Sequence, residues 1–166
     1  MRTWRRLYRE GGTYFFTVVT HDRWPCFDRI DRVRKLGDAL RIVRERHPFG
    51  TAAIVVLPDH LHCIWTLPAN DADFSLRWQL VKKQFARDLR GGQRIWQPRF
   101  WEHLIRDEDD MARHMDYIHY NPVKHGLSAS AAAWPHSSFA RHVRNGLYAP
   151  MWGSSMPANV RDMDIE

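Results

Sequence analysis

Residues 52–67 read AAIVVLPDHLHCIWTL, and the rest of the chain can be arranged around this segment. Its first part, residues 52–58, is a short apolar run typical of a buried strand. Pro58-Asp59 favours a turn. Residues 60–67 then predict a second strand that pairs with the first. The segment therefore predicts two adjacent strands, the second of them buried within a sheet.

Further elements flank these two strands on both sides. Residues 13–20 are β-branched and aromatic, which is typical of a strand. Residues 99–106 also predict a strand, because their apolar side chains divide between two faces. Apolar residues recur at helical spacing over residues 31–47 and again over residues 73–90. Each of these helices therefore follows a strand, and the two strands of residues 52–67 lie between the two helices.

A last helix follows the fourth strand. The acidic run from Asp107 to Asp110 suits a helix start, where negative charge complements the helix dipole. Asn121-Pro122 predicts the end of this helix. The order strand, helix, strand, strand, helix, strand is the split βαβ pattern of a ferredoxin-like α+β domain. We therefore expect an antiparallel sheet with helices on one face, plus a C-terminal helix that carries Tyr117.

The composition suits one compact domain that acts on a polyanion. The chain has 166 residues, of which 44% are hydrophobic, and we expect a domain over residues 1–152 with a frayed tail over residues 153–166. Two cysteines fit a reducing cytosol, no secretory leader is recognisable, and no apolar run reaches the roughly 18 residues of a membrane span. The net charge of +6 and the 13% aromatic content favour nucleic acid as the partner.

Two histidines stand out in the strand over residues 60–67. Side chains alternate along a strand, so His60 and His62 point to the same face, about 7 Å apart. Two imidazoles at this separation can converge on one divalent ion. The alternative is that both are ordinary polar residues on the exposed face of an edge strand. The apolar flanking residues weaken that alternative, because a buried polar group without a partner is costly.

Tyr117 and Asn121 are four residues apart in the last helix and therefore share a face. Taken alone, they are better explained as a residue at the rim of an amphipathic helix and a helix C-cap before proline. Beside a metal held by His60 and His62, Tyr117 could attack the phosphorus of a phosphodiester, and Asn121 could supply an oxygen ligand. Oxygen ligands beside two histidines suit Mg²⁺ or Mn²⁺.

Four blocks of the sequence resemble the REP-associated tyrosine transposases, a branch of the HUH superfamily of single-strand transposases and nucleases. The blocks are Gly11 to Thr17, Val56 to Trp65, Ile95 to His103 and Asp116 to Gly126. The resemblance extends from about residue 5 to residue 152. It implies that residues 1–152 form an HUH transposase-like domain.

The resemblance also implies the roles of the candidate site residues. His60 and His62 are expected to bind the metal, Tyr117 to be the single catalytic tyrosine and Asn121 to be a third ligand. Tyr120 is a rival nucleophile, but it lies about 60° further round the helix and next to Asn-Pro. The implied activity is cleavage and rejoining of single-stranded DNA at repetitive extragenic palindromes, which are short hairpins, through a 5′-phosphotyrosine intermediate.

Two other functions stay open at this point. One is a protein that binds DNA hairpins without cleaving them, and the other is a metal-dependent hydrolase in which water is the nucleophile. The resemblance implies a bacterial cytoplasmic protein associated with the nucleoid, either a monomer or a weak homodimer.

The basic residues fall into two groups that are expected to contact DNA phosphates. The residues are Arg2, Arg5 and Arg6 near the amino terminus, and Lys82, Lys83, Arg87 and Arg90 in the helix over residues 73–90. The alternative is that many of them only form a solvated surface. Four tryptophans, at positions 96, 101, 134 and 152, are candidates for base stacking or for core packing. His103 either lines the site or satisfies the strand edge.

Overall fold

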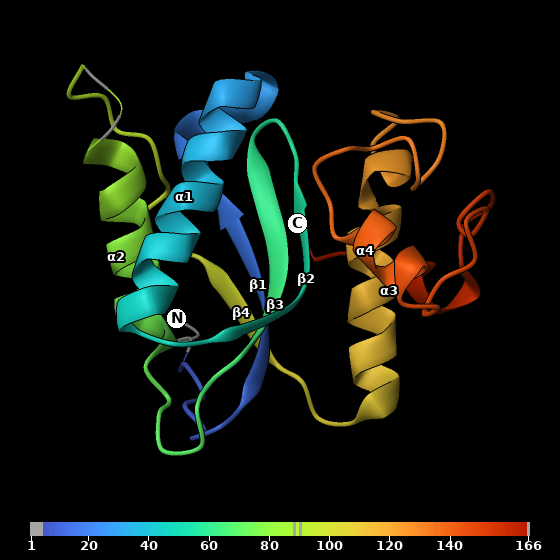
Figure 1. The fold of residues 1–166 in the computed structure, drawn as a ribbon, viewed down its shortest axis with the longest axis horizontal. Coiled ribbons are helices and arrows are strands. Elements are labelled where there is room, and N and C mark those ends of the chain that lie inside the picture. The colour runs from blue at the N-terminus through green and yellow to red at the C-terminus, as the bar shows by residue number, and fades with distance from the viewer. Residues whose placement is uncertain (1–4, 88, 90, 166) are drawn as a thin grey trace.

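The computed structural model describes residues 5–87, 89 and 91–165. One antiparallel sheet of four strands runs through its middle, in the order β2-β3-β1-β4 (Figure 1). The strands are β1 (Thr13–Val19), β2 (Gly50–Val56), β3 (His60–Thr66) and β4 (Trp101–Leu104). The predicted α+β class with an antiparallel sheet is confirmed. β3 lies inside the sheet, between β2 and β1, as its apolar flanks indicated.

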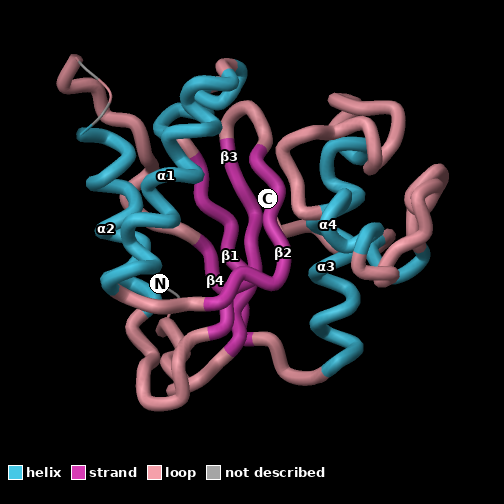
Figure 2. The backbone as a smooth tube through the Cα atoms, viewed as in Figure 1, coloured by secondary structure: helices cyan, strands magenta, loops and turns pink. Residues whose placement is uncertain are grey.

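Helices cover both faces of this sheet (Figure 2). Helices α1 (Ile30–Arg46) and α2 (Phe74–Arg87) lie side by side on one face, where the split βαβ pattern places them. Helices α3 (Glu108–Lys124) and α4 (Phe139–Arg144) lie on the other face. The described residues also form three short 3-10 turns: η1 (His21–Arg23) and η2 (Cys26–Asp28) between β1 and α1, and η3 (Ala158–Val160) after α4.

The sheet divides the interior into two cores because successive side chains point to opposite faces. On β3, Leu61, Cys63 and Trp65 pack with α1 and α2, and the stacked rings of Trp65 and Trp78 lie 4.2 Å apart between centroids. On the other face, Ile64 belongs to the core that includes Ile118 of α3. His60 and His62 share the face of Ile64, so they are directed towards α3 rather than towards α1.

The outer edge of β2 is covered by the segment before α4. The amide of Val56 donates to the carbonyl of His136 (2.8 Å), and the amide of Ser138 donates to the carbonyl of Ile54 (2.8 Å). These bonds satisfy backbone groups that an open sheet edge would expose. They also hold α4 against the side of the sheet that carries α3.

The predicted end of the last helix at Asn121-Pro122 is wrong, because α3 continues to Lys124. Proline lacks an N–H, so Pro122 removes only the hydrogen bond that would reach the carbonyl of Ile118. The helical hydrogen bonds resume at once, and the amide of His125 donates to the carbonyl of Asn121 at 3.0 Å. This additional turn brings Lys124 and His125 to the candidate site.

The expected frayed tail also differs from the structure, while the domain boundary at residue 152 stays a prediction. Val160 and Met163 are buried in the core beside α3. The side-chain amide of Asn159 donates to Asp116 at 2.6 Å, and its backbone carbonyl accepts from Arg113 at 3.2 Å. Val160 and Met163, two apolar side chains among the charged residues of this segment, therefore hold it against α3.

The remaining boundaries shift by a few residues. β4 has four residues where the pattern predicts eight, since the chain turns at Asp107 to cap α3 with its carboxylate. α2 ends at Arg87, before the Gly91-Gly92 pair that was expected to end it. Among the described residues, no helix combines the length and apolar character that would be needed to cross a membrane.

Candidate active site

The candidate site lies between β3 and α3. His60 and His62 are 3% and 0% exposed, and the centroids of their rings are 4.8 Å apart. Their strand pairs with β1 on one side and with β2 on the other, which places His62 opposite both Thr17 and Val55. The alternative of two exposed residues on an edge strand does not hold, because β3 is internal and both histidines are buried.

Each histidine is oriented by a hydrogen bond at Nδ1. His60 Nδ1 donates to Asp59 Oδ1 at 2.6 Å, and His62 Nδ1 is hydrogen-bonded to Thr17 Oγ1 at 2.8 Å. Burial raises the pKa of Asp59, but hydrogen bonds from His60 and Arg23 outweigh it and leave the pKa below its usual value. The ionised carboxylate therefore fixes the tautomer of His60. Nε2 is the nitrogen through which each ring would bind a metal.

Tyr117 lies directly against this histidine pair. Its side chain is 2% exposed, and the centroid of its ring is 5.3 Å from that of His62, with the two rings nearly perpendicular. Lys124 Nζ donates a hydrogen bond to the Tyr117 hydroxyl at 3.4 Å and lies 4.9 Å from the ring centroid. A phenol, two imidazoles and an ammonium group are thus brought together by β3 and α3.

Asn121 lies on the helix face that is directed at the histidines. Tyr117, Asn121 and His125 follow one another at intervals of four residues, so they form one stripe along α3. Tyr117 contacts His62 at one end of the stripe, and the ring of His125 lies 5.5 Å from that of His60 at the other. Asn121, which is fully buried, lies between these two contacts. The stripe explains why a polar amide is placed inside the protein.

Lys124 and His125 are site residues that sequence reasoning missed. The spacing of four that joined Tyr117 to Asn121 also reaches His125, but the predicted helix end at Pro122 removed that residue from consideration. Lys124 follows Tyr117 by seven residues, two turns along the same face. Both side chains belong to exposed residues, so they form the solvent-facing border of an otherwise buried site.

A second cluster of metal-ligating side chains joins β4 to α3. His103, Asp110 and His114 each offer one ligand atom, and these atoms lie within 4.8 Å of one another. His103 Nε2 donates to Asp110 Oδ2 at 2.8 Å, while His114 Nδ1 donates to the Asp110 carbonyl at 2.8 Å. The cluster is compatible with a divalent metal ion. Its members belong to two different elements, because His103 lies in a strand and the others in a helix, so no single spacing pattern joins them.

The protonation states in this cluster follow from burial and hydrogen bonding. Burial raises the pKa of Asp110, but hydrogen bonds from His103 and from the amide of Arg106 outweigh it and bring the pKa to about 2. Burial lowers the pKa of His114 below its usual value. At neutral pH the cluster therefore contains a carboxylate and an uncharged buried imidazole.

The expected phosphate contacts lie in different parts of the molecule. Arg2 and Arg90 lie outside the described residues. Lys83 and Arg87 line a cavity of about 260 Å³ between α1 and α2, on the face of the sheet opposite to the histidine pair. Lys82 is largely buried, donates to the carbonyl of Gln97 at 2.9 Å and has a pKa of about 8, lowered by burial and by the charge of Arg6. The structure thus separates Lys83 and Arg87 from the candidate site, whereas Lys82 lies over the ring of Phe100, at 5.5 Å from its centroid.

A groove with basic and aromatic walls leads from the amino-terminal segment towards the site. Its first part has a volume of about 730 Å³ and its second about 390 Å³. Both parts are lined by Arg99, Phe100 and Trp101. Arg5 and Arg6 border the first part, and the second reaches Thr17, the partner of His62, and Arg23. Arg23 and Arg99 were missed because neither belongs to a run of basic residues.

The tryptophans are divided between core and groove. Trp96 is buried with Phe27 and Phe85, and Trp134 donates its indole N–H to the carbonyl of Val56 at 3.1 Å. Trp152 packs edge-on against Tyr148. Trp101 alone among the four lines the groove over the described residues, where it also stacks on His103.

Comparison with solved structures places the chain among transposases. A solved structure of a REP-associated tyrosine transposase bound to a REP hairpin superposes with a TM-score of 0.86 at 46% identity, and the match covers 95% of this chain and 94% of that one. No protein-family model matches the chain.

Sequence relatives lead to the same family. A REP-associated tyrosine transposase of Escherichia coli K12 is 47% identical over 156 residues, covering 94% of this chain and 93% of the relative. A Haemophilus influenzae protein named "Putative REP-associated tyrosine transposase" is 41% identical over 174 residues, covering 97% and 98%. The chain belongs to the REP-associated tyrosine transposases. The predicted enzyme class, a tyrosine transposase, is confirmed.

Proposed function

We propose that the chain cleaves and rejoins single-stranded DNA at hairpins of repetitive extragenic palindromes, with a divalent metal as cofactor and Tyr117 as nucleophile. The observation that carries the proposal is the position of the Tyr117 hydroxyl. It accepts a hydrogen bond from Lys124 and belongs to a ring packed against His62. A tyrosine placed between a cation and a pair of metal-binding side chains is suited to attack a phosphodiester.

The donor set of the site fits Mg²⁺ or Mn²⁺. His60 and His62 are held at Nδ1, and the buried amide of Asn121 lies on the stripe of α3 that faces them. His60, His62 and Asn121 would hold the ion through two imidazoles and one amide oxygen, and oxygens of phosphate and water would complete its ligands. When bound, the ion would polarise a phosphodiester oxygen and stabilise negative charge in the transition state. His125, which contacts His60, is a further ligand candidate.

The chain's own residues account for the transfer step. Tyr117 gives up its phenol proton to water, and its oxygen forms a bond to phosphorus while the bond from phosphorus to the 3′ oxygen breaks. The leaving 3′ oxygen takes up a proton from water. The Lys124 ammonium stabilises the phenolate that attacks. Rejoining is the reverse reaction, in which a 3′ hydroxyl attacks the phosphotyrosine. The phosphodiester energy is kept in the covalent bond, so that no nucleotide cofactor is needed.

The groove beside β4 is the proposed path of the DNA. Arginines supply phosphate contacts, and Phe100 and Trp101 supply faces for unpaired bases. The groove reaches Thr17, whose hydroxyl is bonded to His62, so a strand lying in it arrives at the metal-binding pair. The related structure is bound to a REP hairpin, and we extend this substrate class to the present chain. Arg5 and Arg6 border this path, whereas Lys83 and Arg87 do not.

A denaturing gel with hairpin oligonucleotides from the host's own intergenic repeats tests this function. With Mn²⁺, the protein is expected to release a fragment with a 3′ hydroxyl and to retain the other fragment as a covalent adduct. Chelation of the metal is expected to stop both products. Tyr117→Phe is expected to abolish cleavage while hairpin binding persists. The matched control is Tyr120→Phe, which removes one hydroxyl from the core between the sheet and α3.

Three outcomes would contradict the proposal in different ways. An adduct that persists in Tyr117→Phe would exclude Tyr117 as the nucleophile. A free 5′ phosphate without any adduct would indicate a hydrolase that activates water. Hairpin binding without cleavage under any divalent metal would indicate a binding protein.

A further inference from the structure

We propose that His103, Asp110 and His114 form a second metal site, separate from the histidine pair on β3 and suited to a transition ion such as Zn²⁺. The site would join β4 to the first turns of α3. It is independent of the cleavage chemistry, since none of its three residues contributes to the transfer step.

The geometry of the three side chains fits one ion. Asp110 and His114 are four residues apart on α3 and therefore lie on one helix face, a spacing that lets two side chains share a metal. His103 reaches them from β4, and its ring lies 4.5 Å from that of His114 between centroids. The two rings are nearly parallel, so one of them would turn to aim its nitrogen at a shared ion. The contacts to the carboxylate are already short, at 2.8 Å from His103 Nε2 and 3.2 Å from His114 Nδ1. Ligand atoms around a tetrahedral zinc ion lie about 3.3–3.6 Å apart, given bonds of about 2.0–2.2 Å. The three ligand atoms here lie within 4.8 Å of one another, so binding would draw the most widely spaced pair together.

The donor chemistry selects the class of ion. Two imidazoles and one carboxylate are the ligands of open zinc sites, in which a fourth position holds water. His103 is 25% exposed while Asp110 and His114 are buried, so the fourth position would face solvent on the side of His103. Binding replaces two N–H···O hydrogen bonds with coordinate bonds and moves each imidazole proton to the other ring nitrogen. The ionised Asp110 and the uncharged His114 need no further proton loss.

Two arginines oppose a cation here. Arg106 Nε lies 3.4 Å from Asp110 Oδ2, and the positive charge of Arg113 is near His114. The Arg106 side chain is 70% exposed, so it can turn into solvent when an ion takes its place. This competition makes Arg106 a residue whose removal should strengthen metal binding, which a merely structural hydrogen-bond network does not predict.

The site is distinct from the histidine pair but close to it. Phe15 lies between the two sites, with its ring 5.4 Å from that of His62 and 4.8 Å from that of His114. On the other side, His103 stacks on Trp101, which lines the groove. An ion at His103 would therefore fix one wall of the groove.

Titration with Co²⁺ tests the proposal, with visible absorption as the readout. The full chain with His60→Ala and His62→Ala removes the first pair of ligands and is expected to bind one Co²⁺. Adding His103→Gln is expected to weaken binding by more than about tenfold, since even the outer partners of metal ligands are worth about 10- to 100-fold. His47→Gln, a histidine at the end of α1 on the opposite face, is the matched control.

Arg106→Gln in the same background provides a test that does not depend on removing a ligand. It is expected to tighten Co²⁺ binding, because the competing cation is gone. The proposal is overturned if the His60→Ala, His62→Ala chain binds no Co²⁺, if His103→Gln and His47→Gln weaken binding equally, or if Arg106→Gln leaves the affinity unchanged.

Discussion

At the scale of single residues, the arrangement around Tyr117 is unusual for a buried tyrosine. Its hydroxyl accepts from Lys124, its ring packs on His62, and both groups belong to elements that fix their positions. Lys124 is exposed, so its charge is partly screened by water, and the benefit to a phenolate is smaller than in a dry interior. The contact is nonetheless specific, because the ammonium lies at the oxygen end of the ring.

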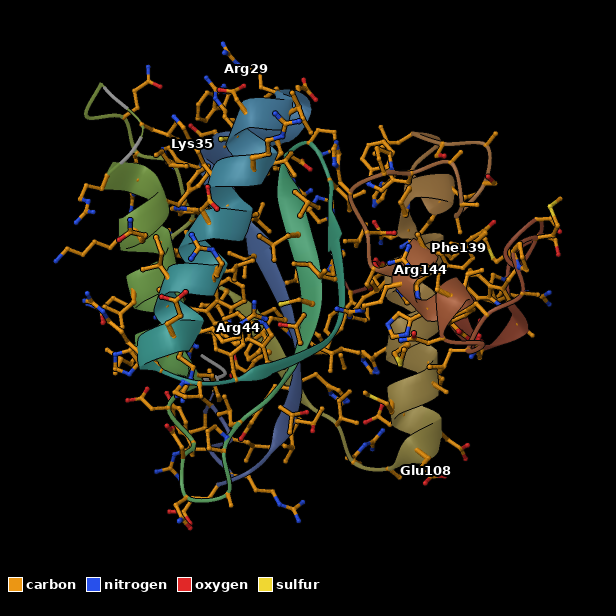
Figure 3. The ribbon with its side chains drawn as sticks, in the orientation of Figure 1. Arg29, Lys35, Arg44, Glu108, Phe139 and Arg144 are labelled. Atoms are coloured by element: carbon orange, nitrogen blue, oxygen red, sulfur yellow. The ribbon has the colours of Figure 1, made fainter. Side chains whose placement is uncertain are left out.

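Replacing Lys124 tests its role in the transfer step. Lys124→Met is expected to lower the single-turnover rate of hairpin cleavage about 10- to 100-fold. This is less than the roughly 100- to 1,000-fold cost of losing a donor in a dry site, because Lys124 is exposed. Hairpin affinity should change much less, and Lys124→Arg should restore most of the rate. Lys35→Met, on α1 and on the far face of the sheet (Figure 3), is the control. A loss confined to affinity would show that Lys124 only contacts phosphate.

At the scale of elements, the site depends on the match between β3 and α3. The alternation along residues 60–67 and the spacing of four between Tyr117 and Asn121 predicted which side chains share a face, and the structure agrees on both. The extension of α3 beyond Pro122 could not be predicted, because one lost backbone bond is offset by tertiary packing that the sequence does not display. His103, Asp110 and His114 were also out of reach, since only the fold brings β4 against α3.

Helix α2 supplies a prediction about stability. Lys82 has a pKa of about 8 in the folded chain, lowered mainly by burial, against 10.5 for a free lysine. Between these values the unfolded chain binds more protons, so this lysine makes the free energy of unfolding rise as pH increases from about 8 to 10.5. Lys82→Met is expected to lose that rise, which amounts to at most about 3 kcal/mol.

Denaturant titrations at several pH values measure this effect as the difference in the free energy of unfolding between the natural chain and each variant. The exposed neighbour Lys83→Met is the control, and its difference from the natural chain should stay constant over the same range. A constant difference for Lys82→Met as well would show that Lys82 is not destabilised by burial in the folded chain.

At the scale of the whole molecule, the sheet separates two basic surfaces. Arg29, Lys35 and Arg44 lie at or beside α1, whereas α3 and α4 lie across the sheet from it (Figure 3). Arg5, Arg23 and Arg99 border the groove beside β4. The net charge of +6 predicted a polyanionic partner but could not say which surface binds it, because charge in a sequence carries no direction. The predictions of a monomer or weak homodimer and of a cytoplasmic, nucleoid-associated location stay predictions.

The two surfaces can be compared by matched arginine substitutions. Arg99→Gln is expected to weaken binding of a single-stranded hairpin and to reduce the slope of log affinity against log salt by about 0.7, the value for one lost phosphate contact. Arg44→Gln, on α1, should change neither quantity. Fluorescence anisotropy over a salt series measures both. Equal effects of the two substitutions would mean that the groove is not the path of the DNA.

The most direct test of the central claim is to identify the residue that carries DNA after cleavage. The covalent adduct is digested with nuclease and protease, and the peptide that retains a nucleotide is sequenced by mass spectrometry. We expect the modification on Tyr117, in the peptide that begins after Arg113. A nucleotide on Tyr120, on any other residue, or on no peptide at all would contradict the assignment of Tyr117 as the nucleophile.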